Sequence, residues 1–211
     1  SMVPTLVVFN TIRDSKEVYH ILKAALDCPV YLLNSNFHPE SRREILRKVK
    51  LHLANRERVF LVSTQLIEAG VDIDFDVVYR DVAPIPNIIQ TAGRCNREGK
   101  LGRGIVYLFQ LYDDELDKLR AKTIYNGKYD GVFLNYTHRV FFSNSLSQPV
   151  FEEKDLFTIQ TNFFKTVSDN FRLGVWESTV TNEVSMVDQI TKFLYGDIGQ
   201  FRLIPESKFG I

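Results

Sequence analysis

Residues 59–79 read V-F-L-V-S-T-Q-L-I-E-A-G-V-D-I-D-F-D-V-V-Y and predict two strands joined by a polar connection. The first apolar run ends at Val62 and is followed by Ser63 and Thr64. A short apolar run of this kind is typical of a buried strand in a parallel sheet. Open α/β sheets bind ligands where such strands end, so both hydroxyls are candidate ligand contacts. Ordinary loop capping is the alternative role for them.

The polar connection also contains a glycine and two carboxylates. Gly70 precedes Asp72 and Asp74, and residues 76–79 restart an apolar strand pattern. Glycine adopts positive φ values at little cost, so the backbone can turn sharply here. The aspartates either bond to nearby backbone as turn residues or contact a ligand.

A second stretch, residues 90–97, reads Q-T-A-G-R-C-N-R and carries two arginines. If it is helical, the i, i+4, i+7 spacing places Gln90, Arg94 and Arg97 on one face. Guanidinium groups stay charged and bind phosphate oxygens in a bidentate way, so this face suits a triphosphate. Gly93 beside them lets another surface approach closely. A surface helix with solvated arginines is the alternative.

Strand and helix patterns alternate along the first half of the chain. Strands are predicted at residues 5–10, 30–33, 59–62, 77–79 and 105–111. Helices are predicted from a capping box at Asp14 and Glu17 to about Leu26, then over residues 39–54 and 90–97. This alternation predicts an α/β fold with a parallel sheet flanked by helices.

The motifs resemble a known family of enzymes. Residues 63–76, S-T-Q-L-I-E-A-G-V-D-I-D-F-D, and residues 90–97 resemble motifs V and VI of superfamily 2 helicases. Residues 6–15, L-V-V-F-N-T-I-R-D-S, resemble motif IV, although Asn36 downstream stands where an arginine is expected. Over residues 4–111, the amino-acid sequence is most similar to the CRISPR-associated type I helicase–nucleases. The resemblance implies a second RecA-like helicase domain.

The resemblance implies half of an ATPase site. Arg94 and Arg97 would be catalytic residues that reach the γ-phosphate of ATP, and Gln90 would help to sense it. The implied cofactor-binding residues are Gly70, Asp72 and Gly93. The chain contains no G-x-x-x-x-G-K-[ST] phosphate loop and no acidic Mg²⁺ motif. ATP and its Mg²⁺ are therefore expected on an upstream RecA-like domain, with no metal ligand in this chain.

Single-stranded DNA is the implied nucleic-acid partner. The residues expected to contact its backbone are Ser63, Thr64, Asn10 and Thr11, in a mode that is independent of base sequence. The family implies 3′ to 5′ movement along the strand, an upstream nuclease domain and recruitment by a CRISPR surveillance complex. We expect the isolated chain to hydrolyse no ATP.

Composition describes a globular chain rather than a basic DNA-binding module. Its 211 residues carry a net charge of +0, and 45% of them are hydrophobic. No apolar run reaches the roughly 18 residues of a membrane-spanning helix, so no membrane association is expected. Cys28 and Cys95 lack disulfide or metal-site spacing, which indicates reduced thiols in a cytoplasmic protein. Cys95 is interpreted as a packing residue.

The sequence allows two alternative roles for each of two segments. The basic stretch 39–58 is either the wet face of an amphipathic helix or a contact for a nucleic-acid backbone. Residues 112–211 are predicted to form an appended mixed α and β region packed on residues 3–111. Their many aromatic side chains either form a core or stack on single-stranded bases.

Two other classes of function remain. The first is a non-CRISPR superfamily 2 helicase that acts on RNA or DNA, which the absence of an upstream histidine–aspartate nuclease domain would indicate. The second is a non-catalytic interaction module whose RecA-like half is degenerate. The intact Gln90, Gly93, Arg94 and Arg97 argue against degeneracy.

Overall fold

The computed structural model describes residues 3–68, 71–97, 99, 104–113, 118–125, 128–142 and 150–173. The chain divides into two units, residues 1–160 and 161–211, and the boundary falls within helix α6 (Glu153–Leu173). The first unit contains both sides of the predicted boundary between residues 111 and 112. A separation into domains at that point therefore stays a prediction.

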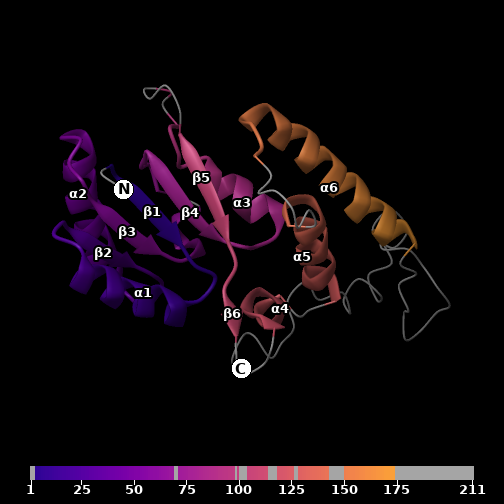
Figure 1. The fold of residues 1–211 in the computed structure, drawn as a ribbon, viewed down its shortest axis with the longest axis horizontal. Helices are drawn as coiled ribbons and strands as arrows, with labels where there is room; N and C mark the ends of the chain where they lie inside the picture. The colour runs from indigo at the N-terminus through magenta and orange to yellow at the C-terminus, as the bar shows by residue number, and fades with distance from the viewer. Residues whose placement is uncertain are drawn as a thin grey trace, which may run out of the picture. The chain divides into compact units, whose positions relative to one another are not determined.

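A five-stranded parallel sheet forms the centre of the first unit (Figure 1). Its strands are β1 (Thr5–Val8), β2 (Val30–Leu33), β3 (Phe60–Ser63), β4 (Val77–Asp81) and β5 (Ile105–Phe109). Their order in the sheet is β2-β3-β1-β4-β5, and every neighbouring pair is parallel. The parallel sheet predicted from the alternating pattern, and the RecA-like fold that the resemblance implies, are confirmed.

Helices cover both faces of this sheet because side chains along each strand alternate between the two faces. Helix α1 (Ile12–Ala25) packs on the face that presents Val7 and Phe9. Helix α2 (Pro39–Ala54) packs on the opposite face, which presents Leu6 and Val8. Helix α3 (Ile85–Ala92) follows β4 and contacts it.

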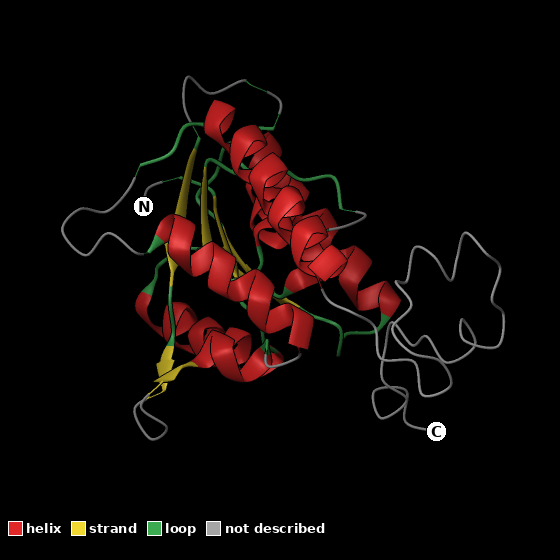
Figure 2. Cartoon of the chain, turned by 90° about the vertical axis from the view of Figure 1, so that its right-hand side faces the viewer, coloured by secondary structure: helices red, strands yellow, loops and turns green. Residues whose placement is uncertain are grey.

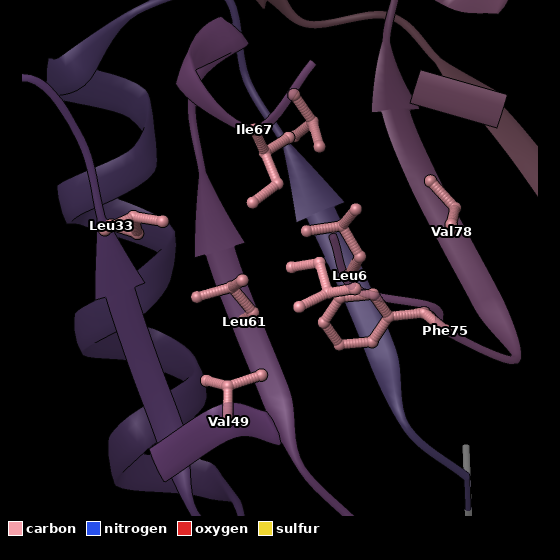
Figure 3. Packing of buried hydrophobic residues seen from close by; sticks show 9 residues of the cluster. Leu6, Leu33, Val49, Leu61, Ile67, Phe75 and Val78 are labelled. Carbon is pink, nitrogen blue, oxygen red and sulfur yellow. The ribbon is translucent and has the colours of Figure 1, made fainter. Parts of the chain in front are cut away.

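The core on the α2 face is built from fully or almost fully buried apolar side chains contributed by neighbouring strands and connections (Figure 3). The side chains labelled there are Leu6, Leu33, Val49, Leu61, Ile67, Phe75 and Val78. Burying a side chain of this size is worth about 1.5–3 kcal/mol relative to leaving it exposed. Ile67 and Phe75 belong to the motif V segment, so this core holds that segment on the sheet.

The start of helix α1 lies earlier than the capping box predicted at Asp14 and Glu17. Thr11 is the N-cap, and its hydroxyl oxygen accepts a hydrogen bond from the Asp14 amide at 3.0 Å. The same hydroxyl donates to Asp14 Oδ2 at 2.6 Å. The predicted start is wrong because threonine satisfies the free amides of the first turn from the N-cap position.

Helix α3 ends at Ala92, so the prediction of a helix over residues 90–97 is wrong. The Phe75 amide donates to the Arg94 carbonyl at 2.9 Å, and the Asn96 amide donates to the Phe75 carbonyl at 2.9 Å. These bonds form a parallel bridge between Phe75 and Cys95. The backbone after Gly93 therefore pairs with the motif V segment instead of continuing the helix.

Gly104 lies immediately before β5, pressed against the segment that follows α3. A Cβ at this position would lie 2.7 Å from Asn96 Cβ and 2.8 Å from Cys95 Sγ. Both distances are shorter than real van der Waals contacts, so a side chain here would displace that segment. At Gly93, by contrast, the nearest atom to an added Cβ would be 3.5 Å away, which is an ordinary contact.

Replacing Gly104 with alanine is expected to lower the free energy of unfolding by about 1–3 kcal/mol, the usual cost of overpacking. Urea unfolding of the 211-residue chain, followed by circular dichroism, measures the change. Gly93→Ala is the matched control and should unfold close to wild type. Equal stability of the Gly104→Ala and wild-type chains would contradict the prediction and show that the segment around Cys95 moves aside at no cost in free energy.

The elements after β5 contact the sheet region within the first unit. Strands β6 (Tyr112–Asp113) and β7 (Lys118–Leu119) form a short antiparallel pair outside the main sheet (Figure 2). They lead into α4 (Arg120–Ile124) and α5 (Lys128–Phe141). A small buried cluster joins β4 to these helices through Val82, Ala121 and Leu134. Across the described residues, no helix has the length and apolar composition to cross a membrane.

Candidate functional site

An exposed ion pair joins the motif V segment to the motif VI segment. Arg97 Nη1 lies 2.8 Å from Asp72 Oδ1, and the two side chains are 49% and 82% exposed. The Arg97 amide also donates to Asp74 Oδ1 at 2.8 Å. Exposed ion pairs contribute little to stability, because water screens them and two flexible side chains must be ordered. The Arg97 guanidinium can therefore leave Asp72 for a more highly charged anion.

Arg94 makes a different contact, with the turn that follows β3. Its Nη2 donates to the main-chain carbonyl of Glu68 at 2.8 Å. Its Nε is buried without a hydrogen-bond partner. A buried donor without an acceptor costs free energy, so this group is suited to an acceptor brought by a ligand. The donor set of Arg94 and Arg97 fits a phosphate group.

The other residues predicted for the nucleotide lie on or at the end of α3, or outside the described residues. Gln90 is an exposed residue of α3. Gly93 is exposed, and no close contact with the described residues requires its lack of a side chain. Room for an approaching surface is therefore available there. Gly70 lies outside the described residues.

The four residues predicted for nucleic acid are placed at the ends of β3 and β1. Ser63 and Thr64 are buried, and the Ser63 hydroxyl donates to the Leu33 carbonyl at 2.7 Å. Thr11 caps helix α1 through its hydroxyl. The Ser63 and Thr11 hydroxyls already donate their protons inside the domain, so a hydrogen bond from either one to a DNA phosphate would require that proton to be redirected.

Asn10 uses every polar atom of its side chain inside the domain. Its Nδ2 donates to Asp81 Oδ2 and to the Val82 carbonyl, both at 2.7 Å. Its Oδ1 accepts from Arg80 Nη1 at 2.8 Å and from the Tyr125 hydroxyl at 3.1 Å. Asn10 therefore joins β1 and β4 to the segment after β5. Its predicted contact with nucleic acid stays a prediction.

The two groups of predicted residues lie at opposite edges of the sheet. Ser63 is the last residue of β3 and Asn10 follows β1, so both lie at the carboxyl edge. Arg97 lies near the amino edge, because Cys95 pairs with Phe75 just before β4. A ligand at one edge can influence the other edge only through residues that span the space between them.

A buried ionic network, which the sequence reasoning missed, occupies that space. Arg80 Nη2 lies 3.0 Å from Glu68 Oε1, and the two side chains are 0% and 5% exposed. The Glu68 carboxylate also accepts from Asn87 Nδ2 at 2.8 Å and Thr91 Oγ1 at 3.2 Å. Two signals were available in the sequence. Arg80 interrupts an apolar strand, and Asn87, Thr91 and Arg94 follow the i, i+4, i+7 spacing.

Burial governs the two strongly shifted titrating groups near the network. It raises the pKa of the Asp81 carboxyl to about 6, although Arg80 opposes the shift. It also raises the pKa of the Cys95 thiol to about 11, so the thiol stays protonated and is no nucleophile. Cys95 packs against the core, as predicted. No group of three or more potential metal ligands occurs among the described residues.

The five-stranded parallel sheet with helices on both faces defines a RecA-like domain. The family described as "CRISPR-associated nuclease/helicase Cas3, C-terminal" matches residues 3–100. The resemblance drawn from the motifs is confirmed, because residues 3–100 correspond to a C-terminal helicase portion of the Cas3 type.

Individual proteins agree with the family match. A CRISPR-associated nuclease/helicase Cas3 of Haloferax volcanii is 44% identical over 95 residues, which cover 44% of this chain and 10% of that protein. A Cas3 of Methanothermobacter thermautotrophicus is 29% identical over 162 residues, which cover 71% of this chain and 18% of that protein. The chain therefore spans less than a fifth of these relatives.

Solved structures share the fold. The crystal structure of T. fusca Cas3 with AMPPNP has a TM-score of 0.63 at 19% identity, covering 94% of this chain and 22% of that one. A structure described as "CRISPR RNA-guided surveillance complex, pre-nicking" has a TM-score of 0.57 at 20% identity, covering 94% of this chain and 24% of the matched one. At these identities the similarity shows the RecA-like fold alone.

Proposed function

We propose that the chain is the second RecA-like domain, with its following segment, of an ATP-dependent helicase of CRISPR interference that moves along single-stranded DNA. The observation that carries this proposal is the exposed ion pair of Arg97 with Asp72 beside the half-buried Arg94. Arg94 and Arg97 are two cations from motif VI. Asp72 is the motif V carboxylate that the resemblance assigns to the nucleotide.

The chemistry of the pair follows from where charge develops. When bound, ATP supplies the phosphoanhydride bond whose cleavage spreads negative charge over the terminal phosphate oxygens. Arg97 would leave Asp72 and stabilise this charge, and the Nε–H of Arg94 would donate a hydrogen bond to one phosphate oxygen. Asp72 and Gln90 would then contact the nucleotide. The Mg²⁺ ligands are proposed to belong to the upstream RecA-like domain.

Single-stranded DNA is proposed to lie across the carboxyl edge of the sheet. Ser63, Thr64, Asn10 and Thr11 are concentrated there, and backbone contacts from this edge would be independent of base sequence. The proposed partners are the upstream RecA-like domain, a nuclease domain of the same protein and a CRISPR surveillance complex. The Cas3 family match supports this choice of partners.

Nucleic-acid preference tests the proposed function and separates it from the two alternatives. The full-length protein is expected to hydrolyse ATP when single-stranded DNA is added, with the DNA stimulating turnover strongly. The isolated 211-residue chain is expected to show no turnover under the same conditions, because it has no phosphate loop. Release of phosphate, measured with a coupled assay, reports both.

Each contrary result has a distinct meaning. Stimulation by RNA or duplex DNA in place of single-stranded DNA would indicate another superfamily 2 helicase. A full-length protein that binds no ATP and shows no turnover would indicate an interaction module. DNA-stimulated turnover by the isolated chain would contradict the shared site.

A further inference from the structure

Helix α3 turns a polar face towards the interior. Asn87, Thr91 and Arg94 follow the i, i+4, i+7 spacing of one helical face, although Arg94 lies just beyond the end of the helix at Ala92. All three donate hydrogen bonds to Glu68, at distances between 2.8 and 3.2 Å. A single residue of motif V therefore receives three donors from the motif VI segment.

Glu68 divides these donors between its side chain and its backbone. The carboxylate accepts from Asn87 and Thr91 and so holds the body of α3. The main-chain carbonyl accepts from Arg94 Nη2 and so holds the guanidinium. The carboxylate and the carbonyl belong to one residue, so the position of the guanidinium relative to α3 depends on where Glu68 lies.

Arg80 in turn holds Glu68. The Arg80 side chain is fully buried, and its Nη1 donates to Asn10 Oδ1 and to the Asp81 carbonyl, both at 2.8 Å. Its Nη2 is left for the Glu68 carboxylate. A buried carboxylate needs such a partner, because an unpaired charge in the interior is strongly unfavourable. Glu68 is thus anchored to β4 and, through Asn10, to β1.

We propose that Glu68, held by Arg80, is a positioning residue that sets the location of the Arg94 guanidinium for ATP hydrolysis. The helix cannot do this alone, because it ends at Ala92 and Gly93 separates it from Arg94. Glu68 itself touches no nucleotide in this scheme and acts through Arg94. The catalytic part of this inference rests on the proposed function, whereas the placement of Arg94 does not.

The placement is tested by chemical modification of arginines. In the full-length protein, phenylglyoxal reacts with each arginine according to its accessibility, and mass spectrometry quantifies the product at Arg94 and Arg97. Glu68→Gln removes the charge while keeping the shape of the side chain. It is expected to raise the reactivity of Arg94 about threefold or more, as weakening one hydrogen bond would. The reactivity of Arg97 should not change.

A matched control removes the same charge elsewhere. Glu44 pairs with Arg47 and Lys48 on the exposed surface of α2, so Glu44→Gln should leave Arg94 unchanged. Unchanged reactivity of Arg94 in Glu68→Gln would overturn the proposal. If Glu68→Gln does not fold, the buried Arg80 becomes reactive too. Asn87→Ala, which removes one donor from the half-buried end of the network, then takes its place.

The catalytic role is tested by a double-mutant cycle in the full-length protein. Glu68→Gln is expected to lower kcat about tenfold and to change KM for ATP by less than about twofold, because it perturbs a group used in the transition state. In an Arg94→Ala background, Glu68→Gln should lower kcat no further, because residues that act as a unit are not additive.

The cycle separates this inference from the proposed function. If the double variant loses kcat by the product of the two single-variant losses, Glu68 acts independently of Arg94. That result would contradict the positioning role. Wild-type turnover in Arg94→Ala alone would defeat the proposed role of Arg94 in hydrolysis. The modification experiment would still decide whether Glu68 places its guanidinium.

Discussion

Replacing Arg97 with alanine in the full-length protein is expected to lower DNA-stimulated ATP turnover by about a thousandfold or more, the usual value of an arginine finger. The Arg97 side chain is half exposed and pairs with the solvent-exposed carboxylate of Asp72, so its removal should leave the fold intact. ATP binding should be largely retained, because the upstream domain is proposed to hold the nucleotide. Steady-state kcat and equilibrium binding of a fluorescent ATP analogue measure the two quantities.

Arg94→Ala should cause a similar loss of turnover but with a different structural signature. The Arg94 side chain also donates to the main-chain carbonyl of Glu68 in motif V. Removing this hydrogen bond should lower the midpoint temperature of thermal unfolding. Arg47→Ala is the control for both, since Arg47 is an exposed arginine whose partner is Glu44. Wild-type turnover in Arg97→Ala would defeat its assignment as a finger.

Replacing Arg80 with alanine is expected to destabilise the 211-residue chain by about 3–5 kcal/mol, the cost of breaking a buried ion pair from one side. Arg80 is fully buried, and its removal would leave the Glu68 carboxylate without its charged partner and would take one of two donors from the Asn10 amide oxygen. Urea unfolding monitored by circular dichroism measures the loss. No comparable loss should follow Arg47→Ala, where the pair lies on the surface.

The reason for this loss can be checked by removing both charges. Arg80→Leu combined with Glu68→Leu should recover most of the stability, because two apolar side chains of similar volume need no charged partners. If the double replacement is as unstable as Arg80→Ala, the loss reflects packing rather than a stranded charge. An Arg80→Ala chain that unfolds at the wild-type urea concentration would contradict the role of the network.

The buried network gives a physical route between the two edges of the sheet. Asn10, one of the residues proposed for DNA, lies at the carboxyl edge and bonds Arg80. Arg80 bonds Glu68, whose carbonyl holds Arg94. If DNA binds at the carboxyl edge as proposed, a displacement there would reach Arg94 through hydrogen bonds that are buried or mostly buried. The double-mutant cycle on Glu68 and Arg94 tests the last link of this route.

Local patterns predicted the regular elements well. The third strand was predicted at residues 59–62 and is observed at Phe60–Ser63, because an apolar run bounded by polar residues is a strong signal for a buried strand. The second helix was predicted over residues 39–54 and matches α2, since proline is well placed at the first turn of a helix.

The end of α3 could not be predicted in the same way. The composition of residues 90–97 permits a helix, yet Arg94 and Asn96 bond the backbone of Phe75. That competing partner lies about twenty residues earlier in the chain, so no local periodicity reveals it. The polar face of α3 is consequently formed by Asn87 and Thr91 rather than by Gln90.

The sequence by itself determined the α/β alternation, the resemblance to Cas3-type helicases and the presence of two arginines suited to phosphate. These properties depend on local periodicity and on residue chemistry. Only the tertiary structure decided that Arg97 pairs with Asp72, that Arg94 is held by Glu68 and that Asn10 is saturated internally. Hydrogen-bond partners are chosen by which distant segments the packed sheet brings together, and sequence spacing carries no record of those distances.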